Sequence, residues 1–138
     1  MYNPNMVQPM RDELTSLGIS ELTTPEQVDS FMGEIKSGTA MVVVNSVCGC
    51  AAGGARPGVA LALKHSKLPA KLATVFAGQD KAATEKARTY FTGQPPSSPA
   101  VAIFKDGKLV LMLHRNQIEG RRAQEIAAEL TAAFDSVL

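Results

Sequence analysis

The chain has 138 residues, of which 45% are hydrophobic and 20% are charged. A chain of this size and composition builds one core, so we expect a single α/β domain over residues 1–138. The net charge is only +1, and no cluster of Lys and Arg is longer than Arg121-Arg122. This balance offers no electrostatic footprint for a nucleic acid or a membrane surface, and we expect neither as a partner.

The N-terminal segment shows no targeting signal. A secretory signal needs a charged stretch followed by an apolar one, and residues 1–14 lack this order. No apolar run approaches the roughly 20 residues that span a bilayer. We therefore expect a cytosolic (cytoplasmic) protein, where two neighbouring cysteines serve redox chemistry or metal binding rather than a permanent disulfide.

The first predicted elements precede the cysteines. Pro9 suits the first turn of a short helix that ends near Leu17-Gly18, and residues 19–23 alternate enough for an edge strand. A stronger helix signal follows, because Thr24 is a capping residue with Pro directly after it and Gln three positions on. Hydrophobic residues at helical spacing then follow, which predicts a helix that begins at Pro25 and stops at Gly38.

The middle of the chain alternates strands with helices. Residues 39–45 form a continuous apolar run, typical of a central strand buried on both faces. After the cysteines we expect a helix to about His65, bent near Pro57. Residues 71–77 predict a second buried strand, and Asp80 is expected to cap a helix that runs to about Phe91.

The last third predicts a hairpin and a terminal helix. Strands over 100–105 and 108–114 are joined by Asp106-Gly107, a strong hairpin signal, and should pair antiparallel. A helix over 121–138 has one apolar stripe. The order demands a mixed central β-sheet flanked by helices, and this α/β arrangement, with thiols after a central strand, resembles the thioredoxin fold.

Both cysteines lie in one tripeptide, Cys48-Gly49-Cys50, between the central strand and the next helix. Packing alone does not explain two thiols there. A helix N-terminus favours thiolate over thiol, so we expect Cys48, ahead of the helix, to be the catalytic nucleophile. Cys50 then resolves the mixed disulfide. Gly49 is expected to let the sulfurs approach by adopting backbone angles closed to other residues.

The spacing also predicts the redox potential. A disulfide across one intervening residue closes a very small ring, and strain makes such a bond easier to reduce. We expect the pair to be less reducing than thioredoxin, whose reduction potential is roughly −270 mV. The pair should therefore favour thiol–disulfide exchange over bulk reduction. Arg56 is a candidate for added positive charge near the thiols.

A proline ahead of the hairpin is the second candidate element of the site. Pro99 follows a proline-rich loop and precedes the strand at residue 100. In thioredoxin-like proteins this proline is cis and faces the thiols, and we expect the same here. The Ser98 backbone would then offer N–H and C=O groups to an extended substrate, which makes Gly49, Ser98 and Pro99 the candidate substrate-binding residues.

A zinc-binding module is the alternative interpretation. Structural zinc takes four ligands, and the chain holds two cysteines and two histidines, His65 and His114. Cys48 and Cys50, however, are closer in sequence than the usual ligand spacing of two to four intervening residues. His65 suits a helix end and His114 a strand end, so neither is assigned a catalytic role.

Five short motifs are spread over nearly the whole chain: NSVCGCA at 45–51, GARPG at 54–58, PPSSP at 95–99, FKDGK at 104–108 and IEGR at 118–121. In combination they resemble those of the bacilliredoxins. The resemblance implies an enzyme that removes bacillithiol, a cysteine-based small thiol, from mixed disulfides on oxidised proteins, with disulfide isomerisation as a further activity left open. It implies no bound cofactor, bacillithiol or a related low-molecular-weight thiol as co-substrate, and S-thiolated or disulfide-containing proteins and small thiols as partners.

Two positions depart from the expected patterns. Asn116 follows Arg115 where this family is expected to have a histidine, so no role is assigned to it. The central strand ends in Val43, Val44 and Asn45 and lacks the buried Asp that many thioredoxins keep as a proton acceptor. The proton acceptor for Cys50 is therefore not identified by the sequence.

Overall fold

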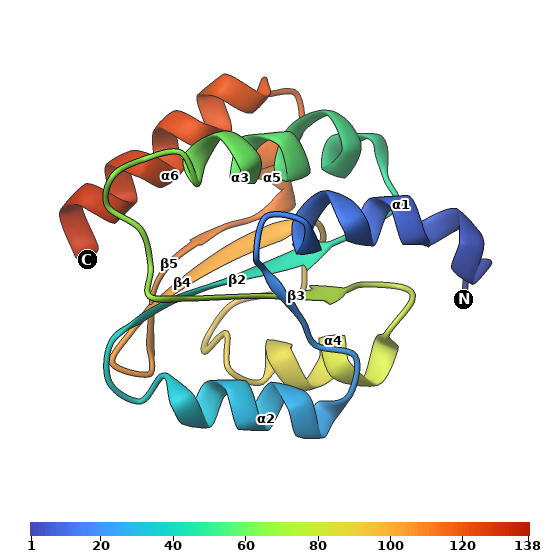
Figure 1. The fold of residues 1–138 in the computed structure, drawn as a ribbon, viewed down its shortest axis with the longest axis horizontal. Coiled ribbons are helices and arrows are strands. Elements are labelled where there is room, and N and C mark those ends of the chain that lie inside the picture. Colours follow the sequence, from blue (N-terminus) through green and yellow to red (C-terminus); the bar gives the residue numbers. More distant parts are fainter.

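The computed structural model describes all 138 residues and is built around a five-stranded mixed sheet with helices on both faces (Figure 1). Its strands, in the spatial order β1-β3-β2-β4-β5, are β1 (Ser20–Glu21), β2 (Thr39–Asn45), β3 (Lys71–Phe76), β4 (Ala100–Lys105) and β5 (Lys108–Leu113). Central β2 pairs parallel with β3 and antiparallel with β4. The predicted α/β class with a mixed central sheet is confirmed.

Helices cover the sheet in two layers, with α2 and α4 on one face and the others on the opposite face (Figure 1). The helical elements are α1 (Pro4–Thr15), α2 (Pro25–Glu34), the π-helical turn η1 (Ala51–Ala55), α3 (Arg56–Ala62), α4 (Lys81–Arg88), α5 (Arg115–Ile118) and α6 (Ala123–Val137). None of them combines the length and the apolar composition needed to cross a bilayer.

Strand β2 contributes to a hydrophobic core on each face of the sheet. Val42 and Val44 pack with α2 and α4, whereas Met41 and Val43 pack with α3 and α6. All four side chains are almost fully buried. Burial of one such side chain stabilises a fold by about 1.5–3 kcal/mol, so the continuous apolar run that predicted this strand is a requirement of its central position.

Two predicted local signals are confirmed at the residue level. Thr24 caps α2, its hydroxyl accepting the N–H of Gln27 at 3.2 Å. Asp106 and Gly107 connect β4 and β5 with positive φ angles of 52° and 78°, as a tight hairpin turn with matching twist requires. Because each of these features depends on contacts between residues only a few positions apart, the sequence alone was enough to predict it.

The predicted start of the first helix was wrong. Helix α1 begins at Pro4, with the Asn3 side chain accepting the N–H of Asn5 at 2.8 Å, and Pro9 lies inside the helix. Both prolines suit a first helical turn, but only Pro4 has a capping residue directly before it. Pro9 removes one internal hydrogen bond, a cost that the packing of buried Val7 and Leu14 offsets.

Asp80 precedes α4 but does not cap it. No side-chain capping bond forms, because the carboxylate accepts two hydrogen bonds from Arg11 of α1, at 2.7 and 3.1 Å. Helix α4 ends at Arg88, and the chain turns before Phe91. A tertiary ion pair thus replaces the local cap that the sequence predicted.

The helix after the thiols is shorter and less regular than expected. It begins with the π-helical turn η1, becomes α-helical at Arg56 near the predicted bend at Pro57, and ends at Ala62. Gly58 packs against α6, where an added Cβ would lie only 2.8 Å from Ile126 Cγ2. The glycines that make this segment a poor helix former therefore allow α3 and α6 to approach closely.

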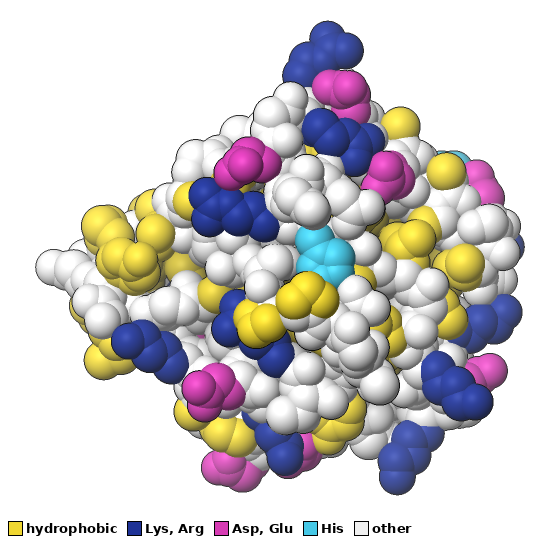
Figure 2. Space-filling model, turned by 180° about the vertical axis from the view of Figure 1, so that it is seen from behind, with side chains coloured by type: hydrophobic (Ala, Val, Ile, Leu, Met, Phe, Trp, Pro, Cys, Tyr) yellow, Lys and Arg dark blue, Asp and Glu magenta, His cyan; other side chains and the backbone are white.

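The face of the molecule opposite to that of Figure 1 carries interspersed acidic and basic side chains, with no large patch of one sign (Figure 2). This mixture agrees with the formal net charge of +1. Long-range electrostatic attraction therefore has little part in selecting a partner on this face, and short-range recognition at a site must do so.

Candidate active site

The two thiols lie at the end of β2, where the chain enters its first helical turns. Cys48 precedes these turns, as expected, and Cys50 lies within them. Both cysteines are half-buried and carry free thiols, and their sulfur atoms are 2.6 Å apart. At this distance either thiol can donate a hydrogen bond to the other, and the two sulfurs are close enough to form a disulfide on oxidation.

Ser46 binds Cys48 through both of its hydroxyl functions. The Ser46 hydroxyl donates to Cys48 Sγ at 3.1 Å and accepts the backbone N–H of Cys48 at 3.2 Å. Ser46 is buried, so water competes little for these bonds. The hydroxyl thereby supports the thiolate and fixes the loop that carries it.

The two thiols have opposite pKa shifts. Burial raises the pKa of Cys48, but hydrogen bonds from Cys50 and Ser46 lower it more, together with those from the backbone N–H groups of Ala51 and Cys50. The pKa of Cys48 therefore lies below its ordinary value. Burial raises the pKa of Cys50, and the hydrogen bond and charge of Cys48 raise it further, against the opposing charge of Arg115. Of the two thiols, Cys48 is therefore the more readily ionised.

Arg56, the candidate for added positive charge near the thiols, is a buried group that supports the site from beneath. Its side chain is 2% exposed. Nη1 donates to Asn45 Oδ1 at 3.0 Å and to the Ser46 carbonyl at 2.7 Å. Asn45 in turn accepts the N–H of Ser46 and donates to the carbonyl of Met10 in α1. Arg56 thus orients Ser46, which contacts Cys48.

Glu13 neutralises this buried guanidinium only in part. Its carboxylate lies 3.2 Å from Arg56 Nε, yet the Nε–H does not point at it and forms no hydrogen bond. The contact is an ion pair without a directed hydrogen bond, so the two hydrogen bonds from Nη1 fix the position of the guanidinium group.

Gly49 has a different role from the predicted one. Its φ is not in the left-handed region, and an added Cβ would meet no atom within 4 Å. Gly49 lines an open cavity together with Cys50. The residue therefore leaves free space beside the second thiol rather than providing an unusual backbone angle.

The proline loop reaches the thiols from the other side of the sheet. The Ser98–Pro99 peptide bond is cis, as expected, and Ser98 lines a cavity together with Cys48. Arg115 Nη1 donates to the Ser98 carbonyl at 3.4 Å. The structure thus brings the predicted Ser98 and Cys48 together, with Arg115 between the loop and the thiols.

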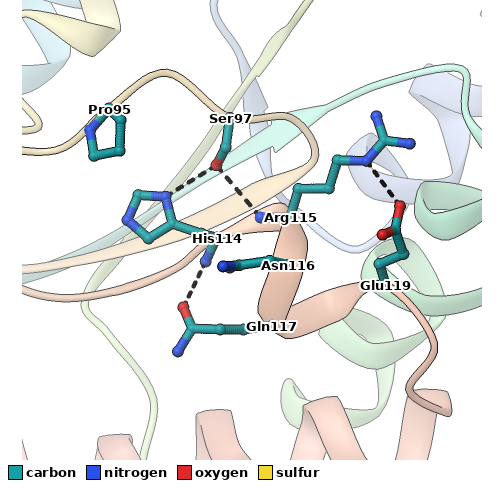
Figure 3. Close-up of a pocket in the computed structure, with 7 residues that line it drawn as sticks. All are labelled: Pro95, Ser97, His114, Arg115, Asn116, Gln117 and Glu119. Carbon is teal, nitrogen blue, oxygen red and sulfur yellow. Dashed lines mark hydrogen bonds and ion pairs between the residues drawn. The ribbon is translucent and has the colours of Figure 1, made fainter.

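A polar cavity of about 520 Å³ adjoins this loop (Figure 3). His114 spans one of its walls, with Nδ1 3.0 Å from the Ser97 hydroxyl and Nε2 2.7 Å from Gln94 Oε1. Since that amide oxygen only accepts, Nε2 carries the proton and Nδ1 accepts from Ser97. His114 anchors the proline loop to the start of α5, and neighbouring Asn116 lines the same cavity.

The zinc alternative has no support in the structure. His114 is held by the proline loop, and His65 pairs with Asp135 of α6 at 2.8 Å. No group of three or more Cys, His, Asp or Glu side chains is arranged to hold a metal ion. The thiols therefore lack the additional ligands that a zinc site requires.

The sequence did not assign a role to Arg115, yet it lies at the centre of the site. Arg115 lines the Cys48 cavity, the Cys50 cavity and the polar cavity of Figure 3. Its Nε pairs with Glu119 at 3.2 Å, drawn in the same figure. The one sequence signal for it is its position two residues after the end of β5, because side chains that follow strand ends come together at one edge of a sheet.

The chain is similar over nearly its whole length to one group of proteins. The family model described as disulphide isomerase matches residues 2–137. A bacilliredoxin of Cytophaga hutchinsonii is 58% identical, over 99% of this chain and 100% of its own. A bacilliredoxin of Bacillus cereus is 50% identical, over 95% of this chain and 90% of its own.

Solved structures with the same fold include two thioredoxins. That of Fasciola hepatica has a TM-score of 0.57 at 20% identity and covers 86% of this chain and 98% of its own. The Schistosoma mansoni thioredoxin pre-protein has a TM-score of 0.60 at 16% identity, covering 87% and 98%. These likenesses show the thioredoxin fold, and the full-length similarity above shows that the chain belongs to the bacilliredoxin family.

Proposed function

We propose that this thiol–disulfide oxidoreductase removes a low-molecular-weight thiol, bacillithiol or a close relative, from mixed disulfides on oxidised proteins in the cytosol. The observation that carries the proposal is the pair of thiols 2.6 Å apart, in which the pKa of Cys48 is lowered and that of Cys50 is raised. In such a pair the thiolate attacks a disulfide, and the neighbouring protonated thiol remains available to resolve the mixed disulfide that forms. The names of the relatives agree with this chemistry.

The first step exchanges one disulfide for another. The Cys48 thiolate attacks the small-thiol sulfur of the mixed disulfide, a new S–S bond forms at Cys48, and the substrate protein leaves as its thiolate. No net oxidation occurs. Hydrogen bonds from Ser46 and the backbone lower the pKa of Cys48 and so favour the thiolate that attacks.

The second step releases the small thiol. Cys50 loses its proton, its sulfur attacks Cys48 Sγ, and the small thiol leaves as the Cys48–Cys50 disulfide forms. The positive charge of Arg115 favours this ionisation of Cys50. A second small thiol, as co-substrate, attacks Cys48 in an equivalent exchange, and the dithiol is restored when two such thiols have become one disulfide.

Isomerisation of protein disulfides is a second candidate activity. The matching family model is described as disulphide isomerase. Because the pKa of Cys50 is raised, Cys50 is slow to resolve a disulfide between Cys48 and a protein substrate. Such a long-lived intermediate gives the substrate time to rearrange its own disulfides. Recovery of scrambled ribonuclease by the Cys50→Ser variant tests this activity, and no recovery would contradict it.

Mass spectrometry of a protein with one S-bacillithiolated cysteine tests the main proposal. We expect the reduced chain to free that cysteine, Cys50→Ser to accumulate one bacillithiol adduct at Cys48, and Cys48→Ser to leave the substrate modified. Parallel substrates carrying cysteine or glutathione identify the preferred thiol. A Cys48→Ser variant that removes the thiol as fast as the parent chain would contradict the assignment of Cys48 as nucleophile.

A further inference from the structure

Two arginines line the cavity beside the nucleophile. The cavity has a volume of about 340 Å³ and exposes Cys48, Ser46 and Ser98. Arg88, the last residue of α4, and Arg115, the first of α5, both contribute to its lining. The two helices lie on opposite faces of the sheet (Figure 1). The fold therefore brings arginines from two separate elements to the lining of one cavity beside Cys48.

Arg88 is the arginine without a protein partner. The chain has six arginines, and the other five each lie within ion-pairing distance of a carboxylate. Arg88 takes part in no ion pair, and its Nε is buried without a hydrogen-bond partner. A buried donor left unpaired is costly, which is the pattern of a group that waits for a ligand.

The chemistry of the cavity selects the ligand. Its nine lining residues include no Asp or Glu, and they add the hydroxyl groups of serines and of Tyr2 to the two guanidinium groups. Arginine binds carboxylates through paired, charge-assisted hydrogen bonds. Glu119 holds Arg115 from outside this cavity and does not line it. The ligand that this lining suits is an anion.

We propose that Arg88 and Arg115 bind a carboxylate of the small thiol while its sulfur meets Cys48. This inference rests on the proposed function and specifies its substrate class, an acidic low-molecular-weight thiol. The two arginines are specificity-determining residues. Arg88 recognises the ligand from the α4 side, and Arg115 recognises it from the side of the proline loop.

Three aliphatic disulfides that differ in charge test this proposal: dithiodipropionate, which is anionic, hydroxyethyl disulfide, which is neutral, and cystamine, which is cationic. Each reacts with the Cys48 thiolate to give a mixed disulfide and one free thiolate, and the Cys50→Ser background stops the reaction there. The readout is the ratio of the anionic to the neutral rate constant. A change in the nucleophilicity of Cys48 alters both rate constants and cancels in this ratio.

We expect the parent chain to prefer dithiodipropionate over hydroxyethyl disulfide and cystamine, with a preference that weakens as salt is added. Arg88→Met should lower the ratio about tenfold, as the loss of a charge-assisted hydrogen bond implies, and Arg88→Lys should restore part of it. Arg115→Met should lower it as well. Lys108→Met, which removes one positive charge at the far hairpin end of the sheet, is the matched control and should leave the ratio unchanged.

An unchanged ratio in both Arg88→Met and Arg115→Met would overturn the carboxylate site while leaving thiol exchange at Cys48 intact. A parent chain that prefers the neutral or the cationic disulfide would also overturn it. A parent chain that reacts with none of the three disulfides would instead contradict the proposed function, on which the inference rests. The two failures are therefore distinguishable.

Discussion

At the residue scale, activity depends on which of two thiols gives up its proton first. Burial disfavours both thiolates, and the outcome is decided by hydrogen bonds that only Cys48 receives from Ser46 and the Ala51 backbone. A helix N-terminus alone, the signal used in the sequence, does not distinguish two thiols this close together. The distinction comes from the buried hydroxyl of Ser46, two residues before Cys48.

Replacement of Ser46 by Ala should raise the pKa of Cys48. With the hydroxyl gone, the thiolate loses one donor while its burial remains, so a smaller fraction of Cys48 is ionised at neutral pH. The pH profile of iodoacetamide alkylation, resolved by mass for Cys48, should move to higher pH, and the rate at neutral pH should fall several-fold. The rate well above the pKa should be unchanged, because the thiolate is then complete in both proteins.

Ser30→Ala is the control for this experiment, because Ser30 is exposed on α2, remote from the thiols. Its alkylation profile should match that of the parent chain. A Ser46→Ala profile identical to the parent profile would show that the backbone N–H groups alone keep Cys48 ionised.

At the element scale, the sequence predicted the parts of the fold that local chemistry determines. Strand β2, the Thr24 cap and the Asp106-Gly107 turn are confirmed, because burial period or turn geometry specifies each within a few residues. The cap expected from Asp80 was wrong, because Arg11, 69 residues away in sequence, binds that carboxylate instead. Short helix α5 was not predicted, because one turn has no hydrophobic period to detect.

The same limit applies to the site. Cys48, Cys50 and the cis Pro99 could be predicted, since their spacing and position along the chain carry the signal. The roles of Arg88 and Arg115 could not, because each depends on a cavity formed by the ends of separate helices. In the sequence, an arginine at a helix end is typical of a charge that stabilises the helix dipole. Only the structure shows that the buried Nε of Arg88 has no hydrogen-bond partner.

The contact between α3 and α6 gives a prediction about stability. In Gly58→Ala the added Cβ would lie 2.8 Å from Ile126 Cγ2 and 3.0 Å from its Cβ, so the two helices must move apart. Overpacking of this kind costs about 1–3 kcal/mol in the free energy of unfolding. Urea denaturation should show a lower midpoint for this variant.

Gly33→Ala is the matched control in α2, where an added Cβ meets no atom within 4 Å. Alanine is the better helix former there, so this variant should gain roughly 0.5–1 kcal/mol. Equal stability changes in the two variants would show that helix propensity, rather than the contact with Ile126, decides the effect.

At the scale of the whole molecule, α1 connects distant parts of the fold, because it contacts β1, the start of α4 and the end of β2 beneath the thiols. Arg11 of α1 pairs with Asp80 at the start of α4 and with Glu21 of β1, at 2.7 and 3.0 Å, and lies over the ring of Phe76. Directly before Arg11 in the same helix, the Met10 carbonyl accepts a hydrogen bond from the side-chain amide of Asn45 beneath the thiols. The ion pairs of Arg11 therefore hold the N-terminal helix against β1 and the start of α4, and the Met10–Asn45 hydrogen bond holds it against the end of β2.

Removal of this network should destabilise the whole fold. In Arg11→Met the carboxylates of Asp80 and Glu21, whose side chains are 15% and 26% exposed, lose their shared cation, and we expect the free energy of unfolding to fall by about 2 kcal/mol. Urea denaturation measures this loss, and Lys71→Met provides the control. The Lys71–Glu34 pair is more than half exposed on both sides and should contribute at most about 0.5 kcal/mol. If the two variants lost equal stability, the Arg11 network would count as another surface ion pair, and the packing of Val7 and Leu14 alone would hold α1 in place.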